Sequence, residues 1–199
     1  MAKTTTKEST KVQLLEAGTE IMLEKGYNNT GIMEVLQSTG VPKGSFYYYF
    51  DSKEDFGMQI INHYDATYSE KLKVLLDETK SPLSLLRSYC EESMRNLEQN
   101  ACRKGCLIGN LSQEMADQSE VFRNRLQEVM LSQRSIFASC IANAQAKGEI
   151  SNTMNASDLA EFFQCGWSGA VMRAKTMKCV EPMKVFSQIL FDHVLKCSA

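Results

Sequence analysis

Apolar side chains recur every three or four residues along most of the chain, a spacing typical of amphipathic helices. Residues 1–8 are expected to form a loose tail. The first helix is expected to follow this tail and to end at Gly26, a left-handed cap. Thr30 is predicted to cap a second, short helix through its hydroxyl. Gly40 then permits the positive φ of a tight turn, so two helices are predicted before residue 40.

A third helix is predicted after the glycine turn. Pro42 can stand in its first turn, because the N–H that proline lacks is not needed there. The helix carries five aromatic residues in succession, at positions 46–50, and is expected to stop near Asp51. Ser52 is followed three residues later by a carboxylate, which is close to a capping box and predicts the start of a fourth helix. This order of helices and a tight turn predicts a helix-turn-helix arrangement.

The five consecutive aromatic residues cannot all be buried by one short helix. Successive helical residues are about 100° apart, so Phe46 and Phe50 share one face while Tyr48 points to the opposite side. Tyr47 and Tyr49 lie on the flanks. We therefore expect Tyr48, and at least one of its tyrosine neighbours, to face solvent with a hydroxyl that can still donate a hydrogen bond.

Longer helical patterns fill the rest of the chain, and no internal repeat or low-complexity segment interrupts them. The sequence therefore predicts an all-α fold, with an N-terminal three-helix helix-turn-helix domain over residues 1–52 and a larger helical domain over residues 53–199. The helices expected in the larger domain span residues 53–79, 83–99, 106–116, 119–147, 156–177 and 182–196.

Composition supports an ordinary globular protein. The 199 residues are 43% hydrophobic and 23% charged, which argues against overall disorder. No apolar run approaches the roughly 20 residues of a membrane span, and the polar N-terminus lacks the apolar core of a signal peptide. Seven cysteines, an odd and widely spaced set, predict free thiols and a cytoplasmic location. They are Cys90, Cys102, Cys106, Cys140, Cys165, Cys179 and Cys197.

Charge and motifs exclude some classes of function. The net charge of −2, with lysines and carboxylates balanced over residues 1–53, means that a DNA-binding role must rest on geometry. No nucleophile motif, phosphate-binding loop or metal constellation is present, so an enzyme is disfavoured and no cofactor is expected. Cys102 and Cys106 lack a second ligand pair, and His63 and His193 have no partner at zinc spacing.

The spacing of several N-terminal residues resembles that of a known family. The pattern runs from Leu14 through Gly26 and Thr30 to GVPKGSFYYYF at residues 40–50 and SKE at residues 52–54. This segment, about the first quarter of the chain, resembles the N-terminal domain of the TetR family, whose members are dimeric, ligand-responsive transcriptional regulators and usually repressors. The resemblance implies a homodimer that binds a palindromic double-stranded DNA operator. It also implies that the larger domain binds an unknown small-molecule inducer and forms the dimer.

The third helix is predicted to contact DNA. Gly44 leaves room for a close approach to the duplex, and Lys43, Ser45 and Tyr48 are predicted to read bases. The resemblance marks the same positions and implies that the two flanking tyrosines contact phosphates. A hydroxyl at the start of the second helix and an ammonium at the start of the fourth are also expected to reach phosphates. The predicted DNA contacts are Thr30, Lys43, Gly44, Ser45, Tyr47, Tyr48, Tyr49 and Lys53. The alternative is that the aromatic residues are core, which is expected of Phe46 and Phe50.

The last two predicted helices have the composition of a dimer interface. Small residues at positions 166 and 170 allow helices to approach closely, and two such helices from each subunit would form a four-helix contact. The resemblance implies the same surface, although packing within one chain would use the same residues. The predicted interface residues are Phe162, Gly166, Gly169, Ala170, Phe186, Ile189, Leu190 and Val194.

Cys106 is a candidate sensing thiol. It follows Arg103 and Lys104 near a predicted helix start, where positive charge stabilises a thiolate. Together with Lys175, it resembles a branch of the family that senses reactive electrophiles, exemplified by the N-ethylmaleimide reductase repressor. An inert, buried cysteine is the favoured alternative. A conventional pocket is the other inducer site considered, and its candidate lining residues are Tyr64, Tyr68, Tyr89, Phe137, Phe163 and Trp167.

The sequence thus predicts a DNA-binding regulator that acts as a homodimer and is released by a small molecule or an electrophile. The alternative is a helical ligand-binding or partner-binding protein without specific DNA recognition.

Overall fold

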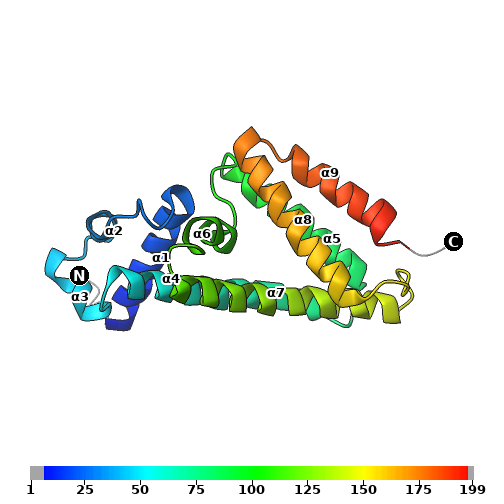
Figure 1. Ribbon diagram of the computed structural model, residues 1–199, viewed down its shortest axis with the longest axis horizontal. Helices are drawn as coiled ribbons and strands as arrows, with labels where there is room; N and C mark the ends of the chain where they lie inside the picture. The colour runs from blue at the N-terminus through cyan, green and yellow to red at the C-terminus, as the bar shows by residue number, and fades with distance from the viewer. Residues whose placement is uncertain (1–6, 197–199) are drawn as a thin grey trace, which may run out of the picture. The chain divides into compact units, whose positions relative to one another are not determined.

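The computed structural model describes residues 7–196, and every regular element among these residues is a helix (Figure 1). The predicted all-α fold is confirmed. The elements are α1 (Lys7–Lys25), α2 (Ile32–Thr39), η1 (Lys43–Ser45), α3 (Phe46–Tyr49), α4 (Lys53–Leu72), η2 (Lys73–Leu76), α5 (Pro82–Gln99), α6 (Leu107–Met115), α7 (Glu120–Ala146), α8 (Ala156–Met177), α9 (Glu181–Ile189) and η3 (Leu190–Val194). Residues 1–6 of the predicted tail lie outside the described residues, whereas Lys7 and Glu8, also predicted as tail, belong to α1.

After α3, the helix boundaries differ from the predicted ones in two places. The helix expected over residues 53–79 ends at Leu72, after which the backbone tightens into the 3-10 turns of η2 and the Asp77 N–H donates to the Val74 carbonyl at 3.2 Å. The last predicted helix is interrupted at Ile189, where a π-helical turn, η3, replaces the α-helix. The remaining boundaries lie within a few residues of the predicted ones.

The chain folds as two compact units, and each unit is assembled from two separate stretches of sequence. Unit 1 contains the residues up to Thr67 together with Leu107–Gln127. Unit 2 contains Tyr68–Cys106 and the residues from Glu128 onward. This division differs from the predicted boundary at residue 52, because α6 and parts of α4 and α7 belong to unit 1.

Unit 1 packs around three phenylalanines. Phe46, Phe50 and Phe56 are buried, with ring centroids 5.2 Å, 5.3 Å and 4.7 Å apart. Gly18 brings α1 close to α4, since a β-carbon there would lie 2.4 Å from Cζ of Phe56. Ser52 begins α4 as predicted, because its Oγ accepts a hydrogen bond from the N–H of Asp55 at 3.0 Å. These contacts fix the ends of α3 and α4 relative to α1.

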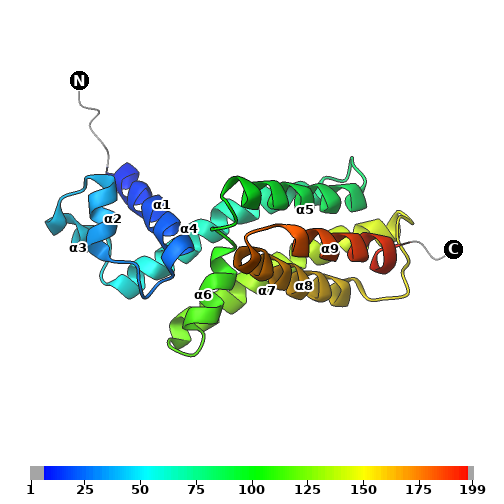
Figure 2. The same ribbon diagram turned by 90° about the horizontal axis from the view of Figure 1, so that it is seen from above.

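Unit 2 has a larger apolar core that includes Leu86, Phe137, Phe163 and Trp167. In this unit α8 and α9 lie side by side, as Figures 1 and 2 show. Asn155 caps α8, since its side-chain oxygen accepts from the Ser157 N–H at 2.7 Å.

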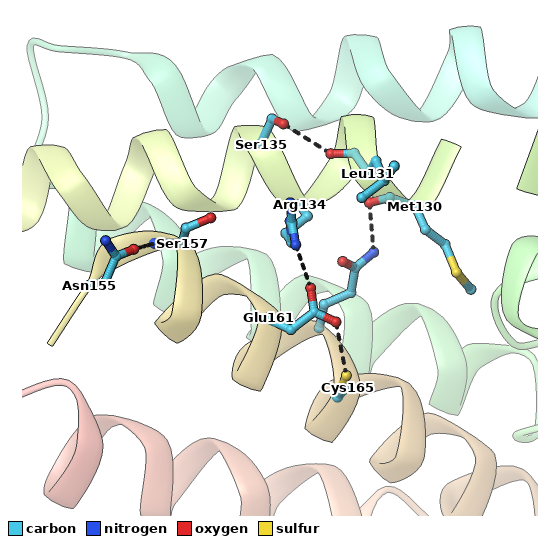
Figure 3. Close-up of polar contacts among 9 residues, drawn as sticks. Met130, Leu131, Arg134, Ser135, Asn155, Ser157, Glu161 and Cys165 are labelled. Carbon is cyan, nitrogen blue, oxygen red and sulfur yellow. Dashed lines mark hydrogen bonds and ion pairs between the residues drawn. The ribbon is translucent and has the colours of Figure 1, made fainter. Parts of the chain in front are cut away.

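Two polar contacts join α7 and α8 (Figure 3). Arg134 donates to the Glu161 carboxylate at 2.9 Å, and Gln164 Nε2 donates to the Met130 carbonyl at 3.2 Å. Glu161 also accepts a weak hydrogen bond from the thiol of Cys165. From one contact to the other the residue number rises along α7 and falls along α8, so the two helices are antiparallel here.

None of the helices formed by residues 7–196 combines the length and the apolarity that crossing a bilayer requires.

Candidate nucleic-acid interface and effector region

The third helix is shorter and tighter than predicted. It consists of the 3-10 turn η1 and the four residues of α3, which ends where the Phe50 N–H donates to the Phe46 carbonyl at 3.0 Å. Pro42 precedes η1 with φ −59° and ψ 143°, so the prediction that it lies in the first turn is wrong. With its extended ψ, Pro42 is the last residue of the connection that follows α2. The φ that the proline ring fixes is compatible both with this position and with the first turn of a helix.

The aromatic residues are divided between the interior and the surface as helical geometry predicts. Phe46 and Phe50 are buried, whereas Tyr48 is 64% exposed and Tyr47 is 70% exposed. Tyr49 is half-buried, and its ring meets that of Tyr48 edge-on with centroids 5.1 Å apart. The prediction that Tyr48 and one flanking tyrosine face solvent is therefore confirmed.

The residues before the tyrosines continue this exposed surface. Lys43 and Gly44 are exposed, and Ser45 is half-buried. A β-carbon on Gly44 would meet no atom within 4 Å, and the φ of this residue is not in the left-handed range. Neither packing within the chain nor the backbone conformation therefore requires glycine at this position. The η1–α3 surface is defined here as Lys43, Gly44, Ser45, Tyr47 and Tyr48.

A further cation lies beside the η1–α3 surface. The ammonium of Lys7, at the start of α1, is 4.1 Å from the ring centroid of Tyr48. A cation over a tyrosine face is attracted by the ring quadrupole, so this contact helps to orient the exposed ring.

Thr30 does not cap α2. Its side chain is 1% exposed, and its hydroxyl donates to the Gly26 carbonyl at 2.6 Å. The N-cap of α2 is Gly31, which has no side chain that could cap the helix. The capping prediction is wrong because Thr30 belongs to the preceding turn, where its N–H donates to the Tyr27 carbonyl at 3.2 Å. A buried hydroxyl that is already bonded supports the turn from inside.

Lys53 is directed toward the turn between α1 and α2. Its ammonium donates to the Asn28 carbonyl at 3.1 Å and lies 4.8 Å from the ring centroid of Tyr27. Burial lowers the pKa of Lys53, while the negative charge of Glu114 acts in the opposite direction. Two of the three ammonium hydrogens are left for other partners.

The turn between α1 and α2 is also held by a carboxylate from α6, which sequence reasoning missed. Glu114 accepts hydrogen bonds from the N–H groups of Tyr27 at 2.7 Å and of Asn28 at 2.8 Å. Gly26 makes room for it, since a β-carbon there would lie 2.4 Å from Glu114 Oε2, and the φ of +78° also favours glycine. Successive N–H groups after such a residue form a concave binding site for an anion.

In unit 2, most of the predicted pocket residues come together. Tyr89 and Phe137 have ring centroids 5.4 Å apart, and Phe163 lies 4.8 Å from Phe137 and 6.0 Å from Trp167. The hydroxyls of Tyr68 and Tyr89 share a hydrogen bond of 2.5 Å. These five residues form the aromatic cluster of unit 2.

Cys106 lies close enough to the aromatic cluster to affect the pKa of Tyr89, and it also interacts with Lys175. Burial lowers the pKa of Lys175, the positive charge of Lys178 lowers it further, and Cys106 raises it. Burial also raises the pKa of Tyr89, and Cys106 contributes in the same direction. Cys106 itself is half-buried and directly precedes α6. Tyr64 belongs to unit 1, so it is not one of the residues that unit 2 brings together.

The paired helices α8 and α9 leave apolar side chains uncovered. Phe162 is 49% exposed and Ile189 is 50% exposed, and a β-carbon on Gly169 would meet no atom within 4 Å. Phe186 and Val194 are half-buried. The α8–α9 face is defined by its exposed apolar residues Phe162, Met172, Val185 and Ile189.

Three residues predicted for the dimer interface serve packing inside unit 2. Ala170 and Leu190 are buried in the apolar core. A β-carbon on Gly166 would lie 2.2 Å from Cε2 of Phe186, so this glycine lets α8 and α9 of one chain approach closely. The close helix approach that Gly166 and Ala170 allow is thus observed within one chain, and their part in a contact between subunits stays a prediction.

The cysteines within the described chain are free thiols, as predicted, and Cys197 lies outside the described residues. Burial raises the pKa of Cys90 to about 12 and that of Cys140 to about 11, so neither thiol is activated. Among residues 7–196, no group of three or more His, Cys, Asp and Glu side chains is placed to hold a metal ion.

Unit 1 thus carries a helix-turn-helix with an exposed surface of small, basic and tyrosine residues. Unit 2 carries an enclosed aromatic cluster and an uncovered apolar face. These features are those of a helical DNA-binding regulator with a second helical unit.

The chain belongs to the TetR family. The family model described as "Bacterial regulatory proteins, tetR family" matches residues 14–56, and that described as "Tetracyclin repressor-like, C-terminal domain" matches residues 82–190. The predicted family is confirmed, and the protein is a TetR-type transcriptional regulator with a DNA-binding helix-turn-helix.

Individual relatives agree with this assignment. The chain is 38% identical over 181 residues to the transcriptional regulator AcuR of Cereibacter sphaeroides, covering 90% of this chain and 83% of AcuR. The crystal structure of the regulatory protein TetR from Rhodobacter sphaeroides is 38% identical with a TM-score of 0.87, over 92% of this chain and 97% of that one. The reduced form of Escherichia coli NemR is 26% identical with a TM-score of 0.85, over 92% and 95%.

Proposed function

We propose that the protein is a repressor that binds a palindromic operator as a homodimer and is released by a small molecule or an electrophile acting on unit 2. NemR is by name a transcriptional repressor, and this chain is 28% identical to it over 180 residues. The observation that carries the DNA-binding part is the exposure of Tyr47 and Tyr48 on a helix whose Phe46 and Phe50 are buried. We propose the cytoplasm as its location, because an operator would be reached there.

The η1–α3 surface enters the major groove in this proposal. Lys43, Ser45 and Tyr48 contact base edges, while Tyr47 and Tyr49 position the helix on phosphates. The open space around Gly44 supports this arrangement. Contacts within the chain do not require a glycine there, whereas the close approach of a DNA backbone would. Thr30 acts indirectly by fixing the turn before α2, and Lys53 reaches a phosphate with its remaining ammonium hydrogens.

The α8–α9 face pairs two copies of the chain. Uncovered apolar residues such as Phe162 and Ile189 would be buried in a four-helix contact, and each buried apolar area contributes about 25 cal/mol per Å² before association costs. A palindromic operator requires the two η1–α3 surfaces of such a dimer to lie one DNA turn apart, about 34 Å.

Two effector mechanisms fit unit 2. A ligand packed against the aromatic cluster would favour one conformation of the dimer and so weaken DNA binding by its differential affinity. Alternatively, the thiolate of Cys106 would add to the carbon–carbon double bond of an electrophile, forming an S–C bond while the neighbouring carbon takes up a proton. Cys106 is half-buried, so its thiol is partly open to solvent, which supports access of an electrophile.

Selection of binding sites from random DNA, followed by fluorescence anisotropy at several salt concentrations, tests the DNA-binding proposal. We expect a palindromic consensus. Lys43→Gln should weaken DNA binding. If Lys43 contacts a phosphate, the slope of log affinity against log salt concentration should fall by about 1; if it contacts a base, the sequence preference at one position should be lost. Lys71→Gln, an exposed lysine of α4, is the matched control and should leave both unchanged. Absence of any selected sequence would favour a helical ligand-binding or partner-binding protein, and turnover of a bound metabolite would indicate an enzyme.

The thiol mechanism is tested separately with N-ethylmaleimide on DNA-bound protein. Wild type should release DNA and Cys106→Ser should not, whereas Cys179→Ser, another half-buried cysteine, should behave like wild type. Equal release by wild type and Cys106→Ser would exclude Cys106 as the sensor.

A further inference from the structure

One buried polar side chain interrupts the apolar stripe of α7 in unit 2. Gln133 is 5% exposed and stands where the spacing of the stripe calls for an apolar residue. The other buried positions of α7 in this unit are Val129, Phe137, Cys140, Ile141 and Ala144.

The amide nitrogen of Gln133 is buried without a hydrogen-bond partner, and it is the single such side-chain atom found within residues 7–196. A buried donor that makes no bond has lost its hydration without compensation, so such groups are rare in folded proteins. A leucine would fill the same space without this penalty. The glutamine is therefore unexplained by the packing of the chain itself.

The contacts between α7 and α8 place Gln133 beside the aromatic cluster. Met130 and Arg134 flank Gln133 on α7, and they bond respectively to Gln164 and Glu161 of α8 (Figure 3). The α8 segment between these two partners carries Phe163, whose ring lies 4.8 Å from that of Phe137, one turn beyond Gln133.

Polar groups are present at another side of the same cluster. The Tyr89 hydroxyl bonds the Tyr68 hydroxyl at 2.5 Å and also interacts with the side chain of Ser93. Lys175 contributes a positive charge near Cys106, which in turn influences Tyr89. The interior of unit 2 thus combines aromatic rings with hydrogen-bonding side chains, the composition of sites that bind small organic molecules.

We propose that Gln133 recognises the effector: its Nε2–H donates to a carbonyl or carboxylate oxygen of a small, planar molecule that packs against Phe137 and Phe163. This inference rests on the proposed effector role of unit 2 and specifies the chemical class that the site takes.

Three probes of similar shape test the inference on the full chain by isothermal titration calorimetry: benzoate, acetophenone and toluene. Toluene lacks the acceptor oxygen. Wild type should bind benzoate or acetophenone at least about tenfold more tightly than toluene, since an unpaired buried donor penalises the ligand that cannot accept. Gln133→Leu should remove most of this preference. Gln164→Leu is the matched control, because the Gln164 amide already donates to Met130, and it should keep the preference.

Thermal melting without probe provides a second readout. Gln133→Leu should melt at the same temperature as wild type or higher, because it removes an unpaired buried donor, whereas Gln164→Leu should melt lower. The inference is overturned if Gln133→Leu melts as low as Gln164→Leu, if wild type shows no preference for the acceptor probes, or if the preference survives in Gln133→Leu. Binding of a probe through Gln133 without release of DNA would instead leave the site standing and refute the effector role.

Discussion

Replacing Glu114 by alanine tests whether α6 anchors the turn that leads into α2. The variant loses two hydrogen bonds, from the Tyr27 N–H at 2.7 Å and the Asn28 N–H at 2.8 Å. Hydrogen bonds to charged groups contribute about 1.5–3 kcal/mol each when buried, but Asn28 is exposed and its freed N–H can bond water. We therefore expect a total loss of about 2 kcal/mol, which is about 30-fold in the folding equilibrium and about 4–8 °C in melting temperature.

Urea unfolding followed by far-ultraviolet circular dichroism measures this loss. Gln118→Ala is the control, because Gln118 is exposed and its side chain accepts from the side-chain amide of Asn28 at 3.2 Å near the same turn. It also donates to the main-chain carbonyl of Glu114 at 2.7 Å, but it does not touch the N–H groups of the turn. The control variant should change the unfolding free energy by less than about 0.5 kcal/mol. Equal stabilities of Glu114→Ala and Gln118→Ala would refute the anchoring role.

A double-mutant cycle with Gly26→Ala sharpens the test. In wild type the new β-carbon would lie 2.4 Å from Glu114 Oε2 and would also be strained at φ +78°. In Glu114→Ala the collision is gone, and only the left-handed strain of about 1–2 kcal/mol remains. The double variant should therefore lose less stability than the sum of the two single variants. Strict additivity would mean that Glu114 does not occupy this position in solution.

Three further predictions concern other parts of the molecule. Because burial lowers the pKa of Lys175 in the folded state, the unfolded state binds more protons from that lowered pKa up to 10.5, so stability rises with pH in this window. Lys175→Met should raise the melting temperature at pH 7.5 and flatten its rise toward pH 10 in calorimetry, and an unchanged slope would contradict this. Gly18→Ala should cost about 1–3 kcal/mol in urea unfolding, because its β-carbon would lie 2.4 Å from Phe56. Its counterpart Gly44→Ala should keep stability within about 0.5 kcal/mol yet weaken operator binding about tenfold or more in anisotropy. If the proposed dimer forms through the α8–α9 face, wild type should be a dimer and Ile189→Asp a monomer in light scattering, and a persistent dimer of the variant would exclude this face.

Local features of the fold could be predicted from the sequence because their causes lie within a few residues. Gly26 and Gly40 adopt the left-handed conformations expected of helix ends, with φ +78° and +69°. The burial of Phe46 and the exposure of Tyr48 follow from the helical repeat alone. Such signals need no knowledge of the rest of the chain.

Features that depend on distant contacts could not be predicted in this way. The bond from Glu114 to Tyr27 joins residues 87 positions apart, and no motif marks a glutamate that accepts from a remote turn. Thr30 has the right residue type for a cap, but the preceding turn takes its hydroxyl. In the sequence, Gln133 cannot be distinguished from the exposed polar residues of the same long helix, and its burial is evident only from the packing in the structure.

The glycines show why the two kinds of feature are hard to separate in a sequence. Gly44 and Gly166 both suggested the close approach of a second molecule. A β-carbon on Gly166 would lie 2.2 Å from Phe186 of the same chain, so internal packing explains that glycine completely. A β-carbon on Gly44 would meet nothing within 4 Å, and its φ is not left-handed, so neither cause within the chain applies. No contact within the folded chain explains the missing side chain at Gly44, and in our proposal the close approach of a DNA duplex to the neighbouring exposed tyrosines explains it.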